Sequence, residues 1–493
     1  MSELELKFCL PDDALHSLRS ALRAHGAKRL RLQARYFDTT DGLLARHRIA
    51  LRLRLEGRRW VQTLKTTGDG AVHRLEHEVR IAGLAKAVPV LDPSRHDGSA
   101  AGLALQTVLQ TVPDAVLVER HATDVWRLSC LLQDAGGTQI EAALDIGSVS
   151  SGARSVPIVE LELEHKGGPV QGLFDLATAW VMHGGLWLST ITKAERGQRL
   201  LAGVAEHSKP AVTGAKRPSF DAGVNGADLL RGLLQSTLAQ VLANGSEVAE
   251  GAPAAEITHQ LRVGLRRLRT VLRELAALSP ALATAWDGPL SDTFSKLGQR
   301  RDQQAVAAAV RPLLEAAGAP LLSWHEPPSA DPAAAVREPA FQVTLLAILA
   351  LAHAGDEQFA ALSHKDTLQR VAARLNKLHQ QVAHDGRRFE RLPIEQQHRV
   401  RKQLKRLRYL ADLTATLWPR KAVRSYLKRL GAAQDALGVH NDVAVAADAF
   451  RNDATLQPDA WFAAGYLQAH LAVTARVARK LLVKVADGGR FWT

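Results

Sequence analysis

Residues 3–8 read Glu-Leu-Glu-Leu-Lys-Phe, and this stretch decides how the first half of the chain folds. In a β-strand successive side chains point to opposite faces, so the two glutamates and Lys7 share one face, while the two leucines and Phe8 share the other. Two carboxylates on alternate strand positions, followed by an ammonium group, suit a hard divalent cation and an anion bound to it. The same alternation is also common on the solvated face of an antiparallel sheet, so other strands must decide between the two interpretations.

Length and composition indicate a multidomain globular protein. A chain of 493 residues is too long for one ordinary core, so at least two domains are expected. The acidic opening lacks the basic and apolar regions of a secretory signal. The longest apolar run, residues 343–352, is far short of the roughly 20 residues that span a bilayer, so we expect a buried helix and no membrane insertion. With only two cysteines, a reducing cytoplasm is the expected compartment.

The net charge is unevenly distributed. Nearly all of the formal net charge of +13 falls after residue 205. A strongly basic second half indicates a polyanionic partner, which leaves nucleic acid, an anionic membrane surface and polyphosphate as candidates.

Short alternating runs dominate the first half after a predicted helix at residues 12–25, where leucines recur at helical spacing. With the opening strand, seven such runs separated by Gly and Asp predict an antiparallel sheet or barrel. The runs are residues 35–39, 49–55, 60–65, 74–81, 118–131, 139–146 and 156–164.

Acids and bases occupy different strands. Arg52 and Arg54 share one strand face, and Glu160 and Glu162 repeat the acidic alternation of the opening. A solvated face would more often mix both signs within a strand, whereas segregation suits a site that binds a metal through carboxylates and an anion through Arg and Lys. If the sheet closes with these faces inward, the lumen is a polar tunnel. Further members of the two sets are Lys65, Glu76, Glu78 and Asp145.

Residues 1–205 resemble the CYTH family of triphosphate tunnel metalloenzymes. The resemblance rests on Glu3-x-Glu5-x-Lys7, Tyr36-x-Asp-Thr39, Leu51-Arg-x-Arg54, Thr63-Leu-Lys65, Glu76, Leu144-Asp145-x-Gly147, Glu160-x-Glu162 and Lys193 in Thr192-Lys-Ala-Glu-Arg-Gly197. It implies an eight-stranded antiparallel barrel, with helices outside, that takes a triphosphate into its lumen.

The resemblance also implies roles for these residues. Mg²⁺ or Mn²⁺ would be held by Glu3, Glu5, Glu160 and Glu162, with Asp145 as a further carboxylate of the metal site. The triphosphate would be bound by Lys7, Arg52, Arg54, Lys65 and Lys193, with Glu76 as a lumen carboxylate that positions basic groups, metal or water. Tyr36 matches a position proposed to act with Lys7 in activating water, and a packed strand aromatic is the alternative.

One position departs from the family pattern. Members usually carry an Arg shortly before the aromatic that is Trp126 in this sequence, but Thr123 and Asp124 stand there. Arg120 or Arg127 is a candidate substitute in binding triphosphate; the alternative is that both are surface residues.

Residues 206–221 have the composition of a linker, and residues 222–490 are rich in Ala and Leu with helical periodicity. A loop-like segment at residues 318–339 divides this helical half into repeats of about 222–317 and 340–490. The first repeat contains His259-x-x-Arg262-x-x-x-Arg266-Arg267-x-Arg269, and the second contains His398-x-x-Arg401-x-x-x-Lys405-Arg406-x-Arg408. Each is followed by a Leu-Gly element with an Asp, at Asp302 and Asp442.

The repeated motif places bases along one helical face, opposite a leucine stripe. Like charges at that spacing repel by about 0.2–0.5 kcal/mol per pair, so a polyanion would explain their persistence better than solvation would. These elements resemble the CHAD domain, whose members bind inorganic polyphosphate, and the resemblance implies two four-helix bundles related by a pseudo-two-fold axis. The predicted polyphosphate contacts are His259, Arg262, Arg266, Arg267, Arg269, Arg273, His398, Arg401, Lys405, Arg406 and Arg408, with Arg424 and Lys428 extending the groove.

The sequence thus predicts a mixed α+β chain in which a metal-dependent triphosphatase, acting on inorganic triphosphate or a related triphosphate, is joined to a polyphosphate-binding helical module. A class IV adenylate cyclase and a non-catalytic polyphosphate-binding protein are the alternatives. Few aromatic residues interleave with the basic helices, which disfavours single-stranded nucleic acid and leaves duplex binding as a lesser alternative. The expected location is the cytoplasm, with association with polyphosphate granules as an extension of that expectation.

Overall fold

The structure is a computed structural model that describes residues 2–67, 73–82, 87–112, 114–201, 212–251, 254–282, 284–320, 330–455 and 457–492. Within these ranges, the side chains of residues 2–3, 67, 73–74 and 299–305 are not described. No helix in the described ranges combines the length and the apolar character that crossing a bilayer requires.

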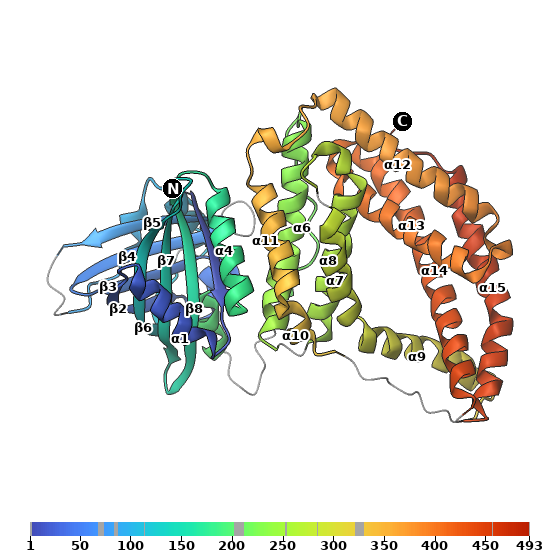
Figure 1. The fold of residues 1–493 in the computed structure, drawn as a ribbon, viewed down its shortest axis with the longest axis horizontal. Helices are drawn as coiled ribbons and strands as arrows, with labels where there is room; N and C mark the ends of the chain where they lie inside the picture. The colour runs from blue at the N-terminus through green and yellow to red at the C-terminus, as the bar shows by residue number, and fades with distance from the viewer. Residues whose placement is uncertain are drawn as a thin grey trace. The chain divides into compact units, whose positions relative to one another are not determined.

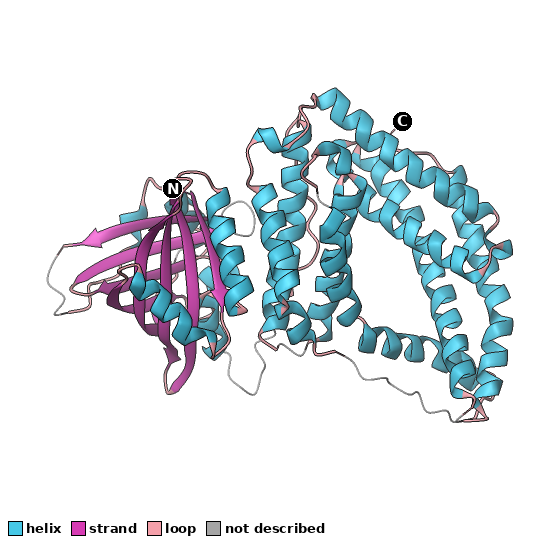
Figure 2. Ribbon diagram, in the orientation of Figure 1, coloured by secondary structure: helices cyan, strands magenta, loops and turns pink. Residues whose placement is uncertain are grey.

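The chain packs as two compact units whose limits differ from those predicted from composition. The first unit comprises residues 1–214, 238–261 and 336–354, and the second comprises residues 215–237, 262–335 and 355–493. All described strands belong to the first unit, and the rest of the chain is helical (Figures 1 and 2). Segments of the helical half therefore pack as part of the unit that contains the sheet.

A nine-stranded antiparallel sheet forms the body of the first unit. Its order is β5-β4-β3-β2-β6-β7-β8-β1-β9, and β1 also pairs with β5. The eight predicted runs correspond to β1–β8, whereas β9 was not predicted because two residues are too few to show a period of two. The strands are β1 Ser2–Cys9, β2 Lys28–Asp38, β3 Ala50–Glu56, β4 Arg59–Thr67, β5 His73–Ile81, β6 Val118–Gln133, β7 Gln139–Ser151, β8 Arg154–Gly167 and β9 Trp187–Leu188.

One face of this sheet is apolar and covered. Leu4, Leu6 and Phe8 are buried, as the alternation of the opening strand predicts. On β3 and β4, Leu51 and Leu64 pack in a cluster that includes residues of α2 and α3. The helices of this part are α1 Ala14–Ala24, α2 Leu43–Arg46, α3 Ala100–Leu109, α4 Gln171–Gly184 and α5 Lys193–Leu201.

The other face is polar along most of its length but has an apolar end. Leu32, Val125, Val149 and Ile158 form a buried cluster there, and Leu200 of α5 packs against it. The cluster closes one end of the polar face, so α5 is placed beside the charged side chains described below.

A helix from the second half completes the first unit. α11 (Pro339–Ala352) packs against α4, and ten of its side chains are buried. This confirms the buried helix expected from the apolar run at residues 343–352. A helix that is apolar on all sides needs partners on several faces, and α4 supplies one of them.

The second unit contains α8, α9, α12, α13, α14 and α15, whereas α6, α7 and α10 are divided between the two units. Each of α12, α13, α14 and α15 packs against two of the other three, and α9 joins α14 and α15 in an apolar cluster around Phe450. The helices of the second half are α6 Gly226–Ala249, α7 Ala255–Glu274, α8 Asp287–Lys296, α9 Gln299–Ala316, α10 Pro332–Arg337, α12 His364–Arg387, α13 Ile394–Leu413, α14 Arg420–Asp453 and α15 Ala460–Asp487, besides α11.

The two repeated basic helices are joined by reciprocal ion pairs. Arg267 of α7 donates to Asp412 of α13 at 3.1 Å, and Arg406 of α13 donates to Glu274 of α7 at 3.2 Å. Arg267 and Arg406 occupy equivalent positions of the repeated motif. The two repeated helices are therefore tied to each other by two ion pairs, one in each direction.

A buried histidine sits on the second copy of the Leu-Gly element. His440 is 4% exposed, and its Nε2 and Nδ1 lie 2.8 Å from Gln397 Oε1 and Thr474 Oγ1 respectively. Gln397 Oε1 only accepts, so Nε2 carries the proton and Nδ1 accepts from the threonine hydroxyl. Burial, together with the charge of His398, lowers the pKa of His440 to about 4.

This depressed pKa predicts a pH-dependent stability. In the unfolded chain the histidine titrates near 6.5, so below that pH the unfolded state binds a proton that the folded state rejects. We expect the free energy of unfolding to fall as the pH drops from about 6.5 to 4, and His440→Gln to flatten that decline by up to about 3 kcal/mol. Urea unfolding at a series of pH values measures this, with the exposed His16→Gln as control. Parallel curves for wild type and His440→Gln would contradict the prediction.

Candidate active site

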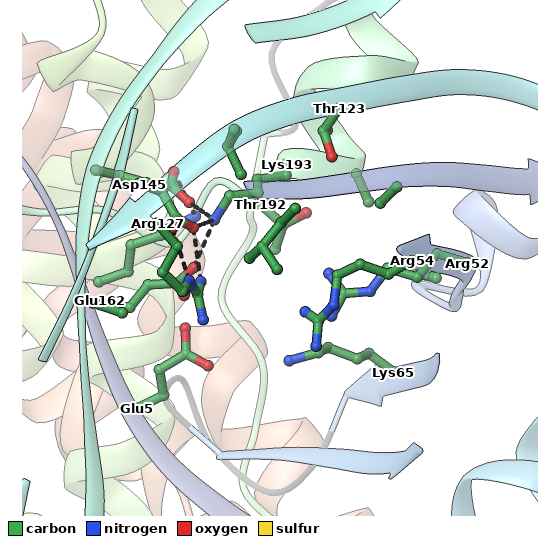
Figure 3. Close-up of a pocket in the computed structure, with 18 of the residues that line it drawn as sticks. Glu5, Arg52, Arg54, Lys65, Thr123, Arg127, Asp145, Glu162, Thr192 and Lys193 are labelled. Carbon is green, nitrogen blue, oxygen red and sulfur yellow. Dashed lines mark hydrogen bonds and ion pairs between the residues drawn. The ribbon is translucent and has the colours of Figure 1, made fainter. Parts of the chain in front are cut away.

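The polar face of the sheet lines a cavity of about 270 Å³. Side chains from all of β1 to β8 and from the start of α5 reach it. Figure 3 shows that Asp145, Glu162, Arg127 and Lys193 converge on one side, while Arg52, Arg54 and Lys65 point toward them from the other. The segregation of charge that the sequence predicted is therefore present within one cavity.

Three carboxylates form the acidic side. Oxygen atoms of Asp145, Glu160 and Glu162 lie within 4.8 Å of one another, and the first two residues are 0% and 1% exposed. Strand register explains the grouping, because Asp145 pairs directly with Glu160, and Glu162 is the next residue of β8 on the same face.

Two cations neutralise much of this cluster. Lys193 Nζ lies 2.8 Å from both Asp145 and Glu162 and also contacts Glu160. Arg127, opposite Asp145 in the strand pairing, donates to both oxygens of that carboxylate at 2.8 and 2.7 Å and also binds Glu162. Burial opposes ionisation, but the two cations outweigh it and hold the pKa values of Asp145 and Glu162 below their usual range. The same contacts raise the pKa of Lys193 despite burial.

The cluster fits a divalent metal. Glu160 Oε2 is buried and has no hydrogen-bond partner among the described atoms, with Lys7 Nζ 3.8 Å away. A buried carboxylate oxygen without a partner is costly unless a cation completes it, and three carboxylates are a donor set for a hard cation such as Mg²⁺ or Mn²⁺. Glu5 lines the same cavity, whereas the side chain of Glu3 lies outside the described residues.

The basic side retains donors for an anion. Arg52 Nε and Arg54 Nε are buried without hydrogen-bond partners in the described structure. Arg52 donates to the Tyr36 hydroxyl at 3.3 Å, Arg54 donates to Glu78 at 3.2 Å, and Lys65 pairs with Glu76. Burial and the neighbouring Arg52 lower the pKa of Arg54. Two adjacent guanidinium groups with donors to spare provide a site for a multiply charged anion.

Tyr36 belongs to a stacked arrangement inside the sheet. Its ring stacks on His121 with centroids 4.6 Å apart, and α5 approaches the histidine so closely that a Cβ at Gly197 would lie 2.0 Å from its ring. Burial, with a contribution from Arg120, lowers the pKa of His121 to about 4, so the ring is neutral at neutral pH. Lys7 lines the same cavity, and its ammonium group donates to the Ile191 carbonyl.

The two candidate substitutes near Trp126 lie in different places. Arg127 lines the cavity, whereas Arg120 is not among the lining residues. The pairing of β2 with β6 passes from Tyr36–His121 to Phe37–Glu119, which leaves Arg120 as the extra residue of a bulge. Trp126 points to the outside, where Arg29 lies over its ring at 3.9 Å. The structure thus brings Arg127 to the carboxylates, and Arg120 stays a prediction without a place in the cavity.

Several lining residues were missed from the sequence. Glu141, Glu164 and Lys166 line the cavity but are not among the predicted site residues, and Arg127 is predicted only as one of two candidates. Lys166 binds Glu164 at 2.6 Å and Glu141 at 3.3 Å. A strict period of two from Asp145 and Glu162 along their strands would have found these three residues. No comparable signal exists for His121, which stacks on the lining residue Tyr36.

The predicted polyphosphate residues are only partly accessible. Arg267 is 2% exposed and pairs with Asp412. This corrects the prediction that Arg267 contacts polyphosphate, because the residue joins α7 to α13 and is not part of a basic surface. Arg269 and Arg273 both pair with Asp287, and Arg406 pairs with Glu274. Arg262 and Arg266 lie over the Phe294 ring at 4.6 and 4.7 Å.

Other members of this set face outward or are half-buried. Arg424 and Lys428 are exposed, and His259, His398, Arg401, Lys405 and Arg408 are half-buried. In the described part of the chain, Arg266, Arg408, Arg424 and Lys428 make no ion pair with an acid.

Two family models match the chain in succession. Residues 1–198 match the CYTH domain, and residues 232–451 match the CHAD domain. The chain carries a CYTH domain followed by a CHAD domain. The CYTH match contains all the strands and the cavity, and the CHAD match contains both copies of the basic helical motif.

Known proteins resemble parts of the chain. An inorganic triphosphatase of Haemophilus influenzae is 31% identical over 168 residues, which cover 34% of this chain and 44% of the relative, so the chain spans less than half of that relative's length. The crystal structure of a CHAD domain from the plant Ricinus communis covers 55% of this chain and 96% of its own at 25% identity, with a TM-score of 0.44. A Hippeastrum protein described as an adenylyl cyclase with a dominant triphosphatase activity covers 42% and 99% at 20% identity, with a TM-score of 0.29.

The carboxylate cluster predicts a specific metal dependence. Glu160→Gln removes the oxygen that has no hydrogen-bond partner and keeps the shape of the side chain, so we expect Mn²⁺ affinity to fall roughly 10- to 100-fold. Isothermal titration of the full-length protein with Mn²⁺ measures it. The matched control is Glu119→Gln, an exposed carboxylate of β6 that pairs with Arg35. Equal affinities for Glu160→Gln and wild type would show that the cluster is not the metal site.

Proposed function

We propose that the CYTH domain is a metal-dependent triphosphatase that hydrolyses inorganic triphosphate or a related triphosphate. The observation that carries the proposal is one cavity in which three clustered carboxylates face Arg52, Arg54 and Lys65. The similarity to an inorganic triphosphatase supports the reaction type, although it covers a minority of both chains.

Different residues of the cavity bind the phosphate groups, balance the charge of the carboxylates and take part in hydrolysis. Arg52, Arg54 and Lys65 neutralise and orient the phosphate groups, because guanidinium and ammonium donors suit phosphate oxygens. Lys193 and Arg127 limit the repulsion between the carboxylates and the incoming anion. Asp145, Glu160 and Glu162, with Glu3 and Glu5 as further candidates, would hold Mg²⁺ or Mn²⁺, which when bound would supply charge neutralisation and lower the pKa of water. Tyr36 accepts a hydrogen bond from Arg52, and its ring stacks on His121. Its proposed role is to act with Lys7 in activating the attacking water.

We further propose that the strands enclose the substrate as an eight-stranded tunnel. The pairing of β1 with β5 joins the two ends of the sequence β5-β4-β3-β2-β6-β7-β8-β1, which supports closure around the cavity. Enclosure strengthens each interaction with phosphate because it excludes water.

Product identity separates this proposal from a class IV adenylate cyclase. A triphosphatase releases phosphate, whereas a cyclase releases a cyclic nucleotide. A panel of tri-, tetra- and long-chain polyphosphates and nucleoside triphosphates, each with Mg²⁺ or Mn²⁺, defines both the substrate and the metal. A cyclic nucleotide as the main product would favour the cyclase.

Charge removal on the basic side tests the proposed reaction. Arg52→Ala and Lys65→Ala are each expected to lower kcat/KM for inorganic triphosphate roughly 100-fold, because they remove donors aimed at the reacting anion. Steady-state phosphate release at fixed metal concentration measures the loss. Arg35→Ala, which removes a surface arginine paired with Glu119, is the control and should retain wild-type activity. Wild-type rates for Arg52→Ala and Lys65→Ala would rule out this cavity as the site of hydrolysis.

We also propose that the CHAD domain binds inorganic polyphosphate and brings the enzyme to it, in the cytoplasm and at polyphosphate granules. Support comes from four basic residues on α7, α13 and α14 that make no ion pair in the described part of the chain, namely Arg266, Arg408, Arg424 and Lys428. Basic residues without acidic partners are the ones that can exchange counterions for a polyanion.

Binding of long-chain polyphosphate to the full-length protein tests this role. The pair Arg408→Ala with Arg424→Ala is expected to weaken polyphosphate binding about tenfold at 0.1 M salt, where surface charges are only partly screened. The matched control is Arg451→Ala, an exposed arginine of α14 that pairs with Asp448. Competition with duplex DNA at the same salt concentration separates the two polyanions. A preference for DNA would overturn the polyphosphate assignment.

A further inference from the structure

A single short segment supplies Lys193 to the cavity. It runs from β9 to α5, residues 187–201, and lies within the CYTH match except for its last residues. Lys193 contacts Asp145, Glu160 and Glu162, and no other cation in the described part of the chain reaches all three. The position of this segment therefore sets the charge balance of the carboxylate cluster.

On the cavity side, the segment is held through its main chain. Lys7 donates to the carbonyl of Ile191, and the amide of Ser189 donates to the carbonyl of Lys7 at 2.8 Å. These bonds fix the residues just before Lys193. α5 itself, which has only nine residues, also contacts β6, β7 and β8, where its Leu200 packs against the apolar cluster.

On the opposite side, the segment is held by residues of the CHAD match that pack in the same unit. Gln342 of α11 accepts from the amide of Leu188 at 2.9 Å, and Ser246 of α6 accepts from the amide of Thr190 at 2.9 Å. Arg337 lies over the Trp187 ring at 4.4 Å.

Two ion pairs then fix the helix. Arg199 pairs with Glu247 near the end of α6, and Arg196 pairs with Glu250, which directly follows that helix. The arginines are three residues apart, so the pairs connect one face of α5 to the C-terminal end of α6. Glu247 is 4% exposed, and burial raises its pKa against the effect of Arg199. A charge held at that depth is tolerated only while its partner stays in place.

The two connections act on one short rigid element. Lys193 begins α5, Arg196 lies one turn further, and Arg199 follows in the next turn. A rotation or shift of the helix would move Lys193 away from the carboxylates. We propose that Glu247 and Glu250 are positioning residues for Lys193, so that α6 of the CHAD domain is part of the scaffold of the active site.

The inference rests on the proposed triphosphatase function and extends it to residues outside the CYTH match. It differs from recruitment to polyphosphate, because the effect requires no ligand on the helical half. It assigns the segment 238–261 a role in how the cavity binds metal and triphosphate.

The test uses the full-length protein with both pairs removed, Glu247→Gln with Glu250→Gln. We expect kcat/KM for inorganic triphosphate to fall about tenfold, because small displacements of a positioned group are costly. Affinity for Mn²⁺, measured by titration without substrate, is expected to rise about threefold, since a displaced Lys193 no longer neutralises the carboxylates. Glu256→Gln, an exposed carboxylate of α7 that only accepts from Gln260, is the matched control and should change neither value.

A second variant tests the same inference if the double variant does not fold. Arg199→Lys keeps the charge of α5 but loses the fixed fork of the guanidinium group, so it should give changes in the same directions, about threefold in kcat/KM. Both measurements are made well below the thermal midpoint of each variant, so that a general loss of stability does not contribute.

The outcomes are distinguishable. Wild-type kcat/KM and wild-type Mn²⁺ affinity in the folded variants would overturn the inference and leave the proposed function intact. Absence of phosphate release from every substrate of the triphosphate and polyphosphate panel by the wild-type protein would overturn the proposed function. The Mn²⁺ titration would then decide alone whether Glu247 and Glu250 position Lys193, and an unchanged affinity would reject it.

Discussion

Mutual repulsion among Asp145, Glu160 and Glu162 is the constraint on which the rest of the first unit depends. Three carboxylates whose oxygens lie within 4.8 Å of one another, two of them buried, cannot all stay ionised without compensating charge. Lys193 and Arg127 supply two positive charges, and the oxygen of Glu160 that lacks a hydrogen-bond partner marks where a metal ion would supply the rest. The cluster is thus ready for a cation on one side and for an anion on the other.

The same constraint connects the sheet to segments of the helical half. Lys193 must be held against desolvation, and its own helix is too short to be stable by itself. α4, α11 and α6 provide the surrounding structure, and their contacts with the sheet region make residues 238–261 and 336–354 part of the first unit. The residue ranges matched by the two family models therefore differ from the ranges of the two compact units in this chain. A domain defined by its sequence motifs need not coincide with a unit defined by contacts.

In the helical half, positive charge is balanced by ion pairs between neighbouring helices. Part of the repeated basic motif is satisfied internally, since Arg267 and Arg406 form reciprocal pairs across α7 and α13 while Arg269 and Arg273 share Asp287. Repulsion along a basic helix face is thus reduced by acids from neighbouring helices, which a helical projection of one segment does not show. The bases that make no such pair are fewer than the motif suggests, and they lie on three helices of both repeats.

The sequence alone determined the strands β1 to β8, the segregation of acids and bases onto one face of the sheet, the internal repeat and the two families. These follow from local periodicity and motif spacing, which a single chain displays directly. Only the tertiary structure decided that Arg127 and not Arg120 reaches the cavity, that Arg267 is buried, and that α6 binds α5. Such facts depend on a bulge, on the neighbours of a helix face and on contacts between residues far apart in the sequence, such as Leu188 and Gln342, which are 154 positions apart. Strand alternation determines the face of the sheet to which a side chain points, but only tertiary packing determines which residues that side chain contacts.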